Sequence, residues 1–163
     1  MRSWPALIPA LKQLTKIKIS LSSSAMIGGD AFKAFATWPK TLTSLDLAYR
    51  NAEKIWTPSK DNVIDIASIF PVLEHLGLSG WSSFGAKNAL TLPASLTSLS
   101  LPCNKLFAKN TPHLNGCLPV GLLHLVIDGT HLTDAACAHL PASLQTLDLC
   151  GSSDLKEPGI RRL

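Results

Sequence analysis

A pattern of leucines that occurs six times is the feature of this 163-residue chain that most constrains its fold. The clearest copy runs from Leu92 to Leu106 and reads LPASLTSLSLPCNKL, in which the core L-x-x-L-x-L begins at Leu96. The other cores begin at Leu14, Leu42, Leu73, Leu122 and Leu144. Successive cores lie about 22 to 31 residues apart. Repetition at such a period indicates a stack of similar units.

Each core alternates apolar and polar residues, which is the period of a β-strand. The middle apolar residues of the six cores are Ile17, Leu45, Leu76, Leu99, Leu125 and Leu147. We expect them to form one inward-facing row, with the intervening residues facing outward. One unit of roughly 25 residues cannot bury its own apolar side. The strands should therefore pair in parallel with their neighbours along the chain.

Between strands the chain must return on the other side of the stack. Three returns have apolar residues at helical spacing, and we expect helices over Asp30–Trp38, Ser59–Phe70 and Leu132–Leu140. The second should begin at Ser59 or Asp61 as its N-cap. The return between Pro102 and Pro119 contains proline, glycine and asparagine, so we expect it to be mostly irregular.

The six cores, with prolines leading into four of them at Pro39, Pro93, Pro119 and Pro141, resemble the leucine-rich repeat family over nearly the whole chain. The resemblance implies an α/β solenoid, a horseshoe of about six repeats with parallel strands on its concave face and mixed helical and irregular returns on its convex face. Residues 1–163 would form a single domain. Within it we expect an N-terminal repeat or cap at 1–29, central repeats over 30–155 and an uncapped tail at 156–163. The family's turn asparagine is matched at Asn104, which the resemblance makes a structural residue.

Composition narrows the class of protein. Hydrophobic residues make up 46% of the chain and charged residues 16%, with a net charge of +4. No run of eighteen apolar residues is present, so we expect no membrane partner. The four cysteines form no C-x-x-C pair, which favours an intracellular, cytoplasmic protein. The first acidic residue is Asp30, and such a basic start leaves a mitochondrial address as the alternative.

The histidines suggest chemistry that we do not expect. His75 and His124 should share one outward column with Ser98, and Asp128 should lie nearby, but a flat sheet offers no oxyanion hole. The spacings of histidine and cysteine match no zinc finger. No phosphate-binding glycine loop is present. The sequence therefore predicts no enzyme, no metal and no cofactor.

The concave face is the predicted site. Its candidate protein-binding residues are Lys16, Lys18, Ser44, Asp46, His75, Ser98, Ser100, His124, Val126, Asp128, Thr146 and Asp148. Most are small, which lets the backbone of a partner approach but supplies few of the large anchors that dominate binding energy. Two interpretations stay open: a shallow groove for a protein segment, or a face left in water or filled by the rest of a larger protein.

Three functions are compatible with this pattern. The first is a non-catalytic protein-interaction scaffold, plausibly a subunit of a larger assembly, with a partner on the concave face and on the C-terminal edge at Leu147 and Leu149. The second is the substrate-recognition module of a ubiquitin ligase, since His131–Leu155 is similar to repeats of F-box proteins and the LPxxLxxLxL lead-in is similar to repeats of bacterial effector ligases. The third is a ribonucleoprotein subunit that contacts nucleic acid through its basic N-terminus and through Arg161 and Arg162.

Overall fold

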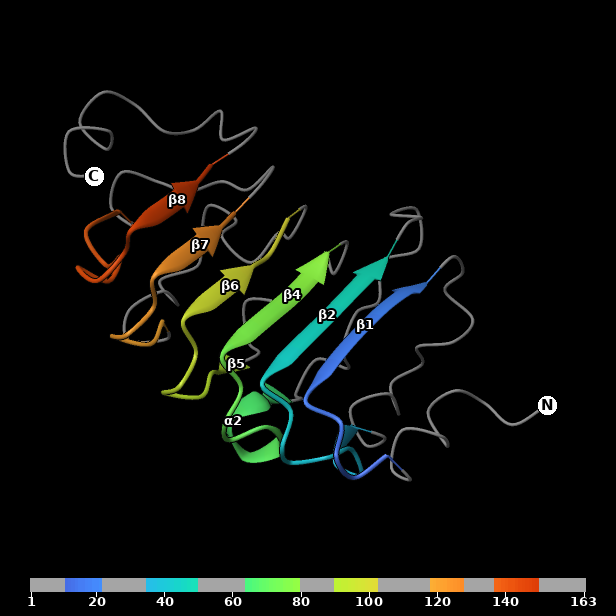
Figure 1. Cartoon of the computed structure of the whole chain (residues 1–163). Coiled ribbons are helices and arrows are strands. Elements are labelled where there is room, and N and C mark those ends of the chain that lie inside the picture. Colours follow the sequence, from blue (N-terminus) through green and yellow to red (C-terminus); the bar gives the residue numbers. More distant parts are fainter. Residues whose placement is uncertain are drawn as a thin grey trace.

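Six parallel strands form one sheet in which the order in space is the order along the chain (Figure 1). The computed structural model describes residues 11–21, 35–49, 64–79, 90–102, 118–127 and 137–149. The strands are β1 (Lys16–Leu21), β2 (Ser44–Tyr49), β4 (His75–Ser79), β6 (Ser98–Ser100), β7 (His124–Val126) and β8 (Thr146–Asp148). Each of the six leucine cores therefore contributes one strand, which confirms the predicted parallel pairing of chain neighbours.

The register agrees with the predicted row at every step. Ile17 pairs with Leu45, and the row continues through Leu76, Leu99, Leu125 and Leu147. Because side chains alternate between the two faces of a strand, a slip of one residue would turn each leucine outward. The apolar row thus fixes the register of the whole sheet.

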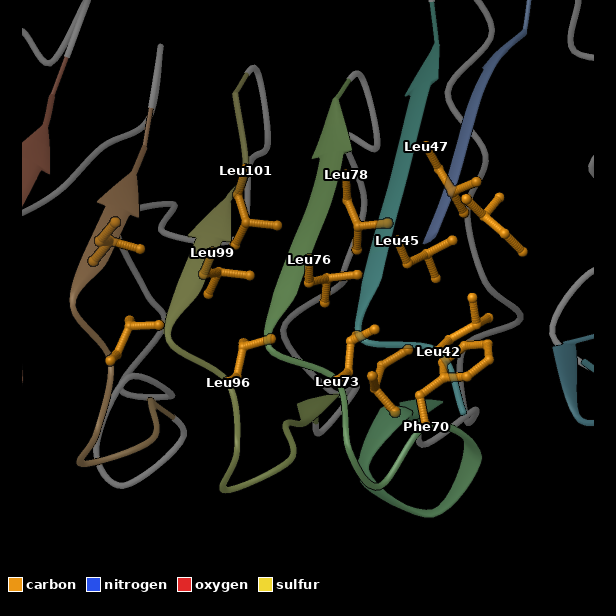
Figure 2. Packing of buried hydrophobic residues seen from close by; sticks show 14 of the residues in the cluster. Leu42, Leu45, Leu47, Phe70, Leu73, Leu76, Leu78, Leu96, Leu99 and Leu101 are labelled. Carbon is orange, nitrogen blue, oxygen red and sulfur yellow. The ribbon is translucent and has the colours of Figure 1, made fainter. Parts of the chain in front are cut away.

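The leucines of each core form the protein's hydrophobic centre (Figure 2). Leu42, Leu73, Leu96 and Leu122, the first leucines of four cores, are fully buried. Leu96, Leu99 and Leu101, which lie before, within and after β6, point to the same side of the sheet (Figure 2). Leu73, Leu76 and Leu78 of the preceding core do the same (Figure 2). The leucines of each repeat bury those of the next repeat, so each interior strand depends on the repeats on both of its sides.

The same tight turn precedes each strand. In four repeats the amide of the first leucine donates to the carbonyl of a proline three residues earlier, at Pro39, Pro93, Pro119 and Pro141. Phe70 and Leu11 take that place before Leu73 and Leu14. The predicted lead-in prolines therefore set the turn by which the chain enters the sheet.

Each turn is tied to the preceding repeat by a bifurcated backbone contact. The carbonyl of Glu74 accepts from the amides of both Thr97 and Ser98, at 2.9 and 3.0 Å. Thr15, Thr43, Thr97 and Leu123 accept two consecutive amides in the same way from the next repeat. This unit occurs at all five junctions between the described strands, so the repeat is regular in its hydrogen bonding as well as in its leucines.

Hydroxyl groups add a second tie at alternate junctions. Thr41, Ser95 and Ser143, each just before the first leucine of a core, donate to the carbonyls of Leu14, Leu73 and Leu122 at 3.1, 2.8 and 2.6 Å. Val72 and Gly121 occupy this position in the other two repeats and carry no hydroxyl. The sequence contains this signal, but the leucine pattern alone did not reveal it.

This alternation makes a paired prediction. Ser95→Ala is expected to lower the free energy of unfolding by about 1 kcal/mol, because it removes one part-buried hydrogen bond. Val72→Thr is expected to raise it by up to about 1 kcal/mol, because the carbonyl of Leu42 is the equivalent of the acceptors that Thr41, Ser95 and Ser143 use at the other junctions. Urea denaturation followed by circular dichroism measures both, with Ser100→Ala as the control for losing an outward hydroxyl. Equal midpoints for Ser95→Ala and Ser100→Ala would mean that the hydrogen bond from Ser95 to the carbonyl of Leu73 does not stabilise the junction.

The second return contains less helix than the sequence predicts. Within Ser59–Phe70, Ile64–Asp65 is a short strand, β3, which pairs in parallel with β5 (Leu90–Thr91), and the helix α2 spans Ile66–Ile69 only. The prediction of one helix from Ser59 is therefore wrong at Ile64 and Asp65. Asp65 is the N-cap, and its carboxylate accepts from the amide of Ser68 at 3.0 Å. Most of Asp30–Trp38 and of Leu132–Leu140, and residues 103–117, lie outside the described part of the chain.

The cap makes a second prediction, on pH. Hydrogen bonds from the side chain and the backbone of Ser68 lower the pKa of Asp65 from its ordinary value of 3.8. A lowered pKa contributes stability above the unfolded-state pKa, and that stability is lost as the pH falls through the folded-state pKa. The gap in free energy of unfolding between the wild type and Asp65→Asn should therefore be constant above about pH 5 and change below about pH 4. A gap that stays constant down to pH 2 would contradict the prediction.

Three aromatic side chains pack together beside α2. Phe35, Trp38 and Phe70 are almost fully buried, and the rings of Phe35 and Trp38 lie 4.6 Å apart between centroids. Phe70 packs against both, at 6.4 and 6.3 Å. Nearby, the Nζ of Lys40 donates to the carbonyl of Ile69 at 2.8 Å, where the end of α2 leaves an unpaired acceptor. These contacts join the lead-in turns of β2 and β4.

Candidate functional site

The side chains between the leucines lie together on the other side of the sheet, which we call the outer face. Its first column, across the six strands in order, is Lys16, Ser44, His75, Ser98, His124 and Thr146. Its second column is Lys18, Asp46, Gly77, Ser100, Val126 and Asp148. The structure thus brings together all the predicted binding residues that it describes. Asp128 and the structural candidate Asn104 lie outside the described residues.

The first column contains two cross-strand hydrogen bonds of the same kind. His75 Nδ1 lies 2.9 Å from Ser98 Oγ, and His124 Nδ1 lies 2.8 Å from Thr146 Oγ1. In each pair an imidazole on one strand meets a hydroxyl on the next, at directly opposite register positions. Such pairs hold side chains in place and stabilise a sheet by roughly 0.2 to 1 kcal/mol. Because Nδ1 makes each of these bonds, Nε2 of each ring takes no part in them.

The second column contains an ion pair that lies over a glycine. Lys18 Nζ is 2.8 Å from Asp46 Oδ2, and the lysine side chain is 76% exposed. A Cβ at Gly77 would stand 2.9 Å from Asp46 Oδ1, closer than real contacts allow. Gly77 therefore leaves the room in which the Asp46 carboxylate lies across β4. An exposed pair of this kind adds at most about 1 kcal/mol to stability, so its value here is positional.

Charge is distributed unevenly over the outer face. Lys16 and Lys18 are exposed on β1 at one end, and Asp148 is exposed on β8 at the other. Between them, β4 and β6 contribute histidine, serine and glycine to the two columns. These two strands carry no lysine, arginine or carboxylate in the two columns, and Gly77 and the serines are small, so a partner's main chain can approach the sheet there.

The two histidine pairs of the first column stay separate from each other. Ser98 meets His75, whereas His124 meets Thr146, so the two histidines do not converge on one hydroxyl. Among the described residues no three His, Cys, Asp or Glu side chains cluster in a way that would hold a metal ion. No helix within the described ranges is long and apolar enough to cross a membrane. The face presents mostly polar side chains in two columns, with Gly77 and Val126 as the exceptions.

The C-terminal edge differs from the interior. Leu147 and Leu149 on and after β8 are half-buried, whereas Leu99 and Leu101 in the middle of the sheet are 1% exposed. The predicted edge residues therefore continue the core, and among the described strands only β7 lies beside them.

Comparison with known proteins gives no further guide to this face. No family model matches the chain, and no curated protein matches it either.

Proposed function

We propose that this protein is a leucine-rich-repeat solenoid that acts as a non-catalytic interaction scaffold, with the outer face of the sheet as its concave, protein-binding surface. Six sequential parallel strands, one for each leucine core, support the assignment of the fold. The identical lead-in turns and bifurcated contacts support it further, because a stack of equivalent units repeats its junctions.

The observation that supports the function most is the pair of columns on the outer face. Its side chains reach partners by hydrogen bonding, through Ser44, Ser98, Ser100 and the two histidines, on a rigid backbone. Parallel strands about 4.8 Å apart present these groups at a regular interval. Gly77 and the serines keep the middle of the face low, which suits a protein segment that crosses the strands. Affinity would come from many modest contacts, with His75 and His124 as the aromatic side chains of the first column.

The proposal is tested with a matched pair of arginine variants. Ser100→Arg places a bulky charge at the centre of the outer face. Val120→Arg places the same side chain on a lead-in turn, at a residue that is 91% exposed and away from the face. Both variants should keep the circular dichroism spectrum and the unfolding midpoint of the wild type.

The immobilised chain and each variant are used to capture proteins from an extract of the source cells, and each captured protein is then purified and titrated. A partner of the outer face should bind the wild type and Val120→Arg equally, and Ser100→Arg at least about tenfold more weakly, or about 1.4 kcal/mol. The proposal fails if no captured protein binds directly, or if Ser100→Arg binds every partner as tightly as Val120→Arg does.

A further inference from the structure

The two outermost described strands carry opposite charges and complementary apolar flanks. Among the described strands, β1 pairs with β2 only and β8 with β7 only, so they stand at the two edges of the sheet (Figure 1). An edge strand presents backbone donors and acceptors to any strand that can pair with it. A strand that pairs there has to match these edges in register, charge and burial.

The inward-facing apolar residues are less buried at the two edges of the sheet than in its middle. The middle residues Leu45, Leu76, Leu99 and Leu125 are at most 1% exposed, whereas Ile17 is 7% exposed and Leu147 is half-buried. Leu14 and Ile19 at one edge, and Leu144 and Leu149 at the other, are also half-buried. A strand of the same repeat, added at either edge, would bury these residues as the interior strands are buried.

Charge selects the pairing. Within the chain, the parallel register sets Lys18 opposite Asp46, and the two side chains form an ion pair at 2.8 Å. Asp148 occupies the same column on β8, and both Lys18 and Asp148 are exposed. If β8 of one copy paired with β1 of another in this register, Asp148 would stand opposite Lys18, and Thr146 opposite Lys16. Lys18 would then lie between two carboxylates, one from each chain.

We propose that the protein assembles head to tail with a second copy of itself, β8 of one copy pairing in parallel with β1 of the next. The contact joins two different edges, so it is heterologous and extends into short rows instead of closing as a symmetric dimer. It uses the edges of the sheet and leaves the middle of the outer face accessible, so it stands independently of the proposed function.

Charge exchange gives the first test, by sedimentation velocity over a range of concentrations. The wild type should show a weight-average mass that rises with concentration beyond that of two chains. Asp148→Lys alone and Lys18→Asp alone should each sediment as single chains, because each sets like charges opposite one another. An equal mixture of the two variants should assemble again, because each edge then meets its opposite. Glu74→Lys, an exposed reversal on the turn before β4, should assemble like the wild type.

Zero-length cross-linking of the wild type gives the second test and needs no variant to fold. A carbodiimide joins an amine to a carboxylate in contact, so it should link Lys18 to Asp46 in every chain, which serves as the internal control. Lys18 and Asp148 of one chain are about 24 Å apart, since five strand spacings of about 4.8 Å separate them. A Lys18–Asp148 peptide is therefore expected in the assembled fraction and not in the single-chain fraction.

Three results would overturn the proposal. The wild type remains a single chain at every concentration, or the mixture of Asp148→Lys and Lys18→Asp fails to recover assembly, or the assembled fraction contains the Lys18–Asp46 peptide without the Lys18–Asp148 peptide.

Discussion

Replacing Leu99 and Leu101 together by lysine is expected to unfold the protein. Both side chains are 1% exposed and lie between the leucines of the preceding and following repeats (Figure 2). Loss of one buried leucine costs about 2 to 5 kcal/mol, and an unpaired buried charge adds to that cost. Two such changes approach or exceed the total stability of about 5 to 15 kcal/mol of an ordinary domain. Circular dichroism should show loss of the strand signal and of the cooperative thermal transition.

The same strand supplies a control for this variant. Ser98→Lys with Ser100→Lys introduces two lysines into β6 on the outer face, and that variant should remain folded, with only the His75 hydrogen bond to Ser98 lost. Leu147→Lys with Leu149→Lys falls on half-buried positions at the edge, so it should weaken the last repeat and leave the earlier strands paired. A Leu99 and Leu101 variant that melts cooperatively near the wild-type midpoint would contradict the described core.

Phe70→Ala is expected to have the second largest effect, a loss of about 3 to 5 kcal/mol in the free energy of unfolding. Phe70 is fully buried and contacts the rings of Phe35 and Trp38, which lead into β2. Its own repeat continues directly into β4 through a turn from its carbonyl to the amide of Leu73. The cavity would therefore loosen the junction between two central repeats.

Val72→Ala is the matched control for Phe70→Ala. Val72 lies two residues further along the same turn and is 46% exposed, so its truncation should cost well under 1 kcal/mol. Guanidinium denaturation of the two variants measures the difference. Similar midpoints for Phe70→Ala and Val72→Ala would mean that the aromatic cluster does not hold the turn.

The sheet was predictable from sequence because its determinants are local and repeated. An L-x-L core specifies both a strand and the face that it buries, and six copies in the same phase define a register with one solution. The positions of Ile17, Leu45 and the later row members follow from this alone. The outer columns follow too, since they are the residues between the leucines.

The second return was harder to predict because its determinants are distant in the chain. Val63, Ile66 and Phe70 are spaced as on a helix, and that spacing favours a helix from Ser59. Ile64 and Asp65 instead pair with Leu90 and Thr91, a contact that the pattern of one segment cannot reveal. Asp65 then caps a helix that has room for four residues only.

The contacts on the outer face were predictable in part. Shared columns placed His75 with Ser98 and His124 with Thr146, but the alternation of apolar residues says nothing about rotamers, and so the hydrogen bonds were not predicted. The overlap of Asp46 with Gly77 is similar: it requires knowing that the carboxylate turns toward β4. The hydroxyls of Thr41, Ser95 and Ser143 show the opposite case, since the signal is periodic in the sequence and a comparison of the position before each first leucine finds it.

The register of the six-stranded sheet is the claim on which the outer face and its edges depend, and solution NMR tests it most directly. With methyl-labelled leucine and isoleucine, cross-strand NOEs should connect Ile17 to Leu45, Leu45 to Leu76, Leu76 to Leu99, Leu99 to Leu125 and Leu125 to Leu147. Backbone NOEs should show parallel neighbours at each step. A row shifted by one residue, an antiparallel pair, or strands paired out of chain order would contradict the account.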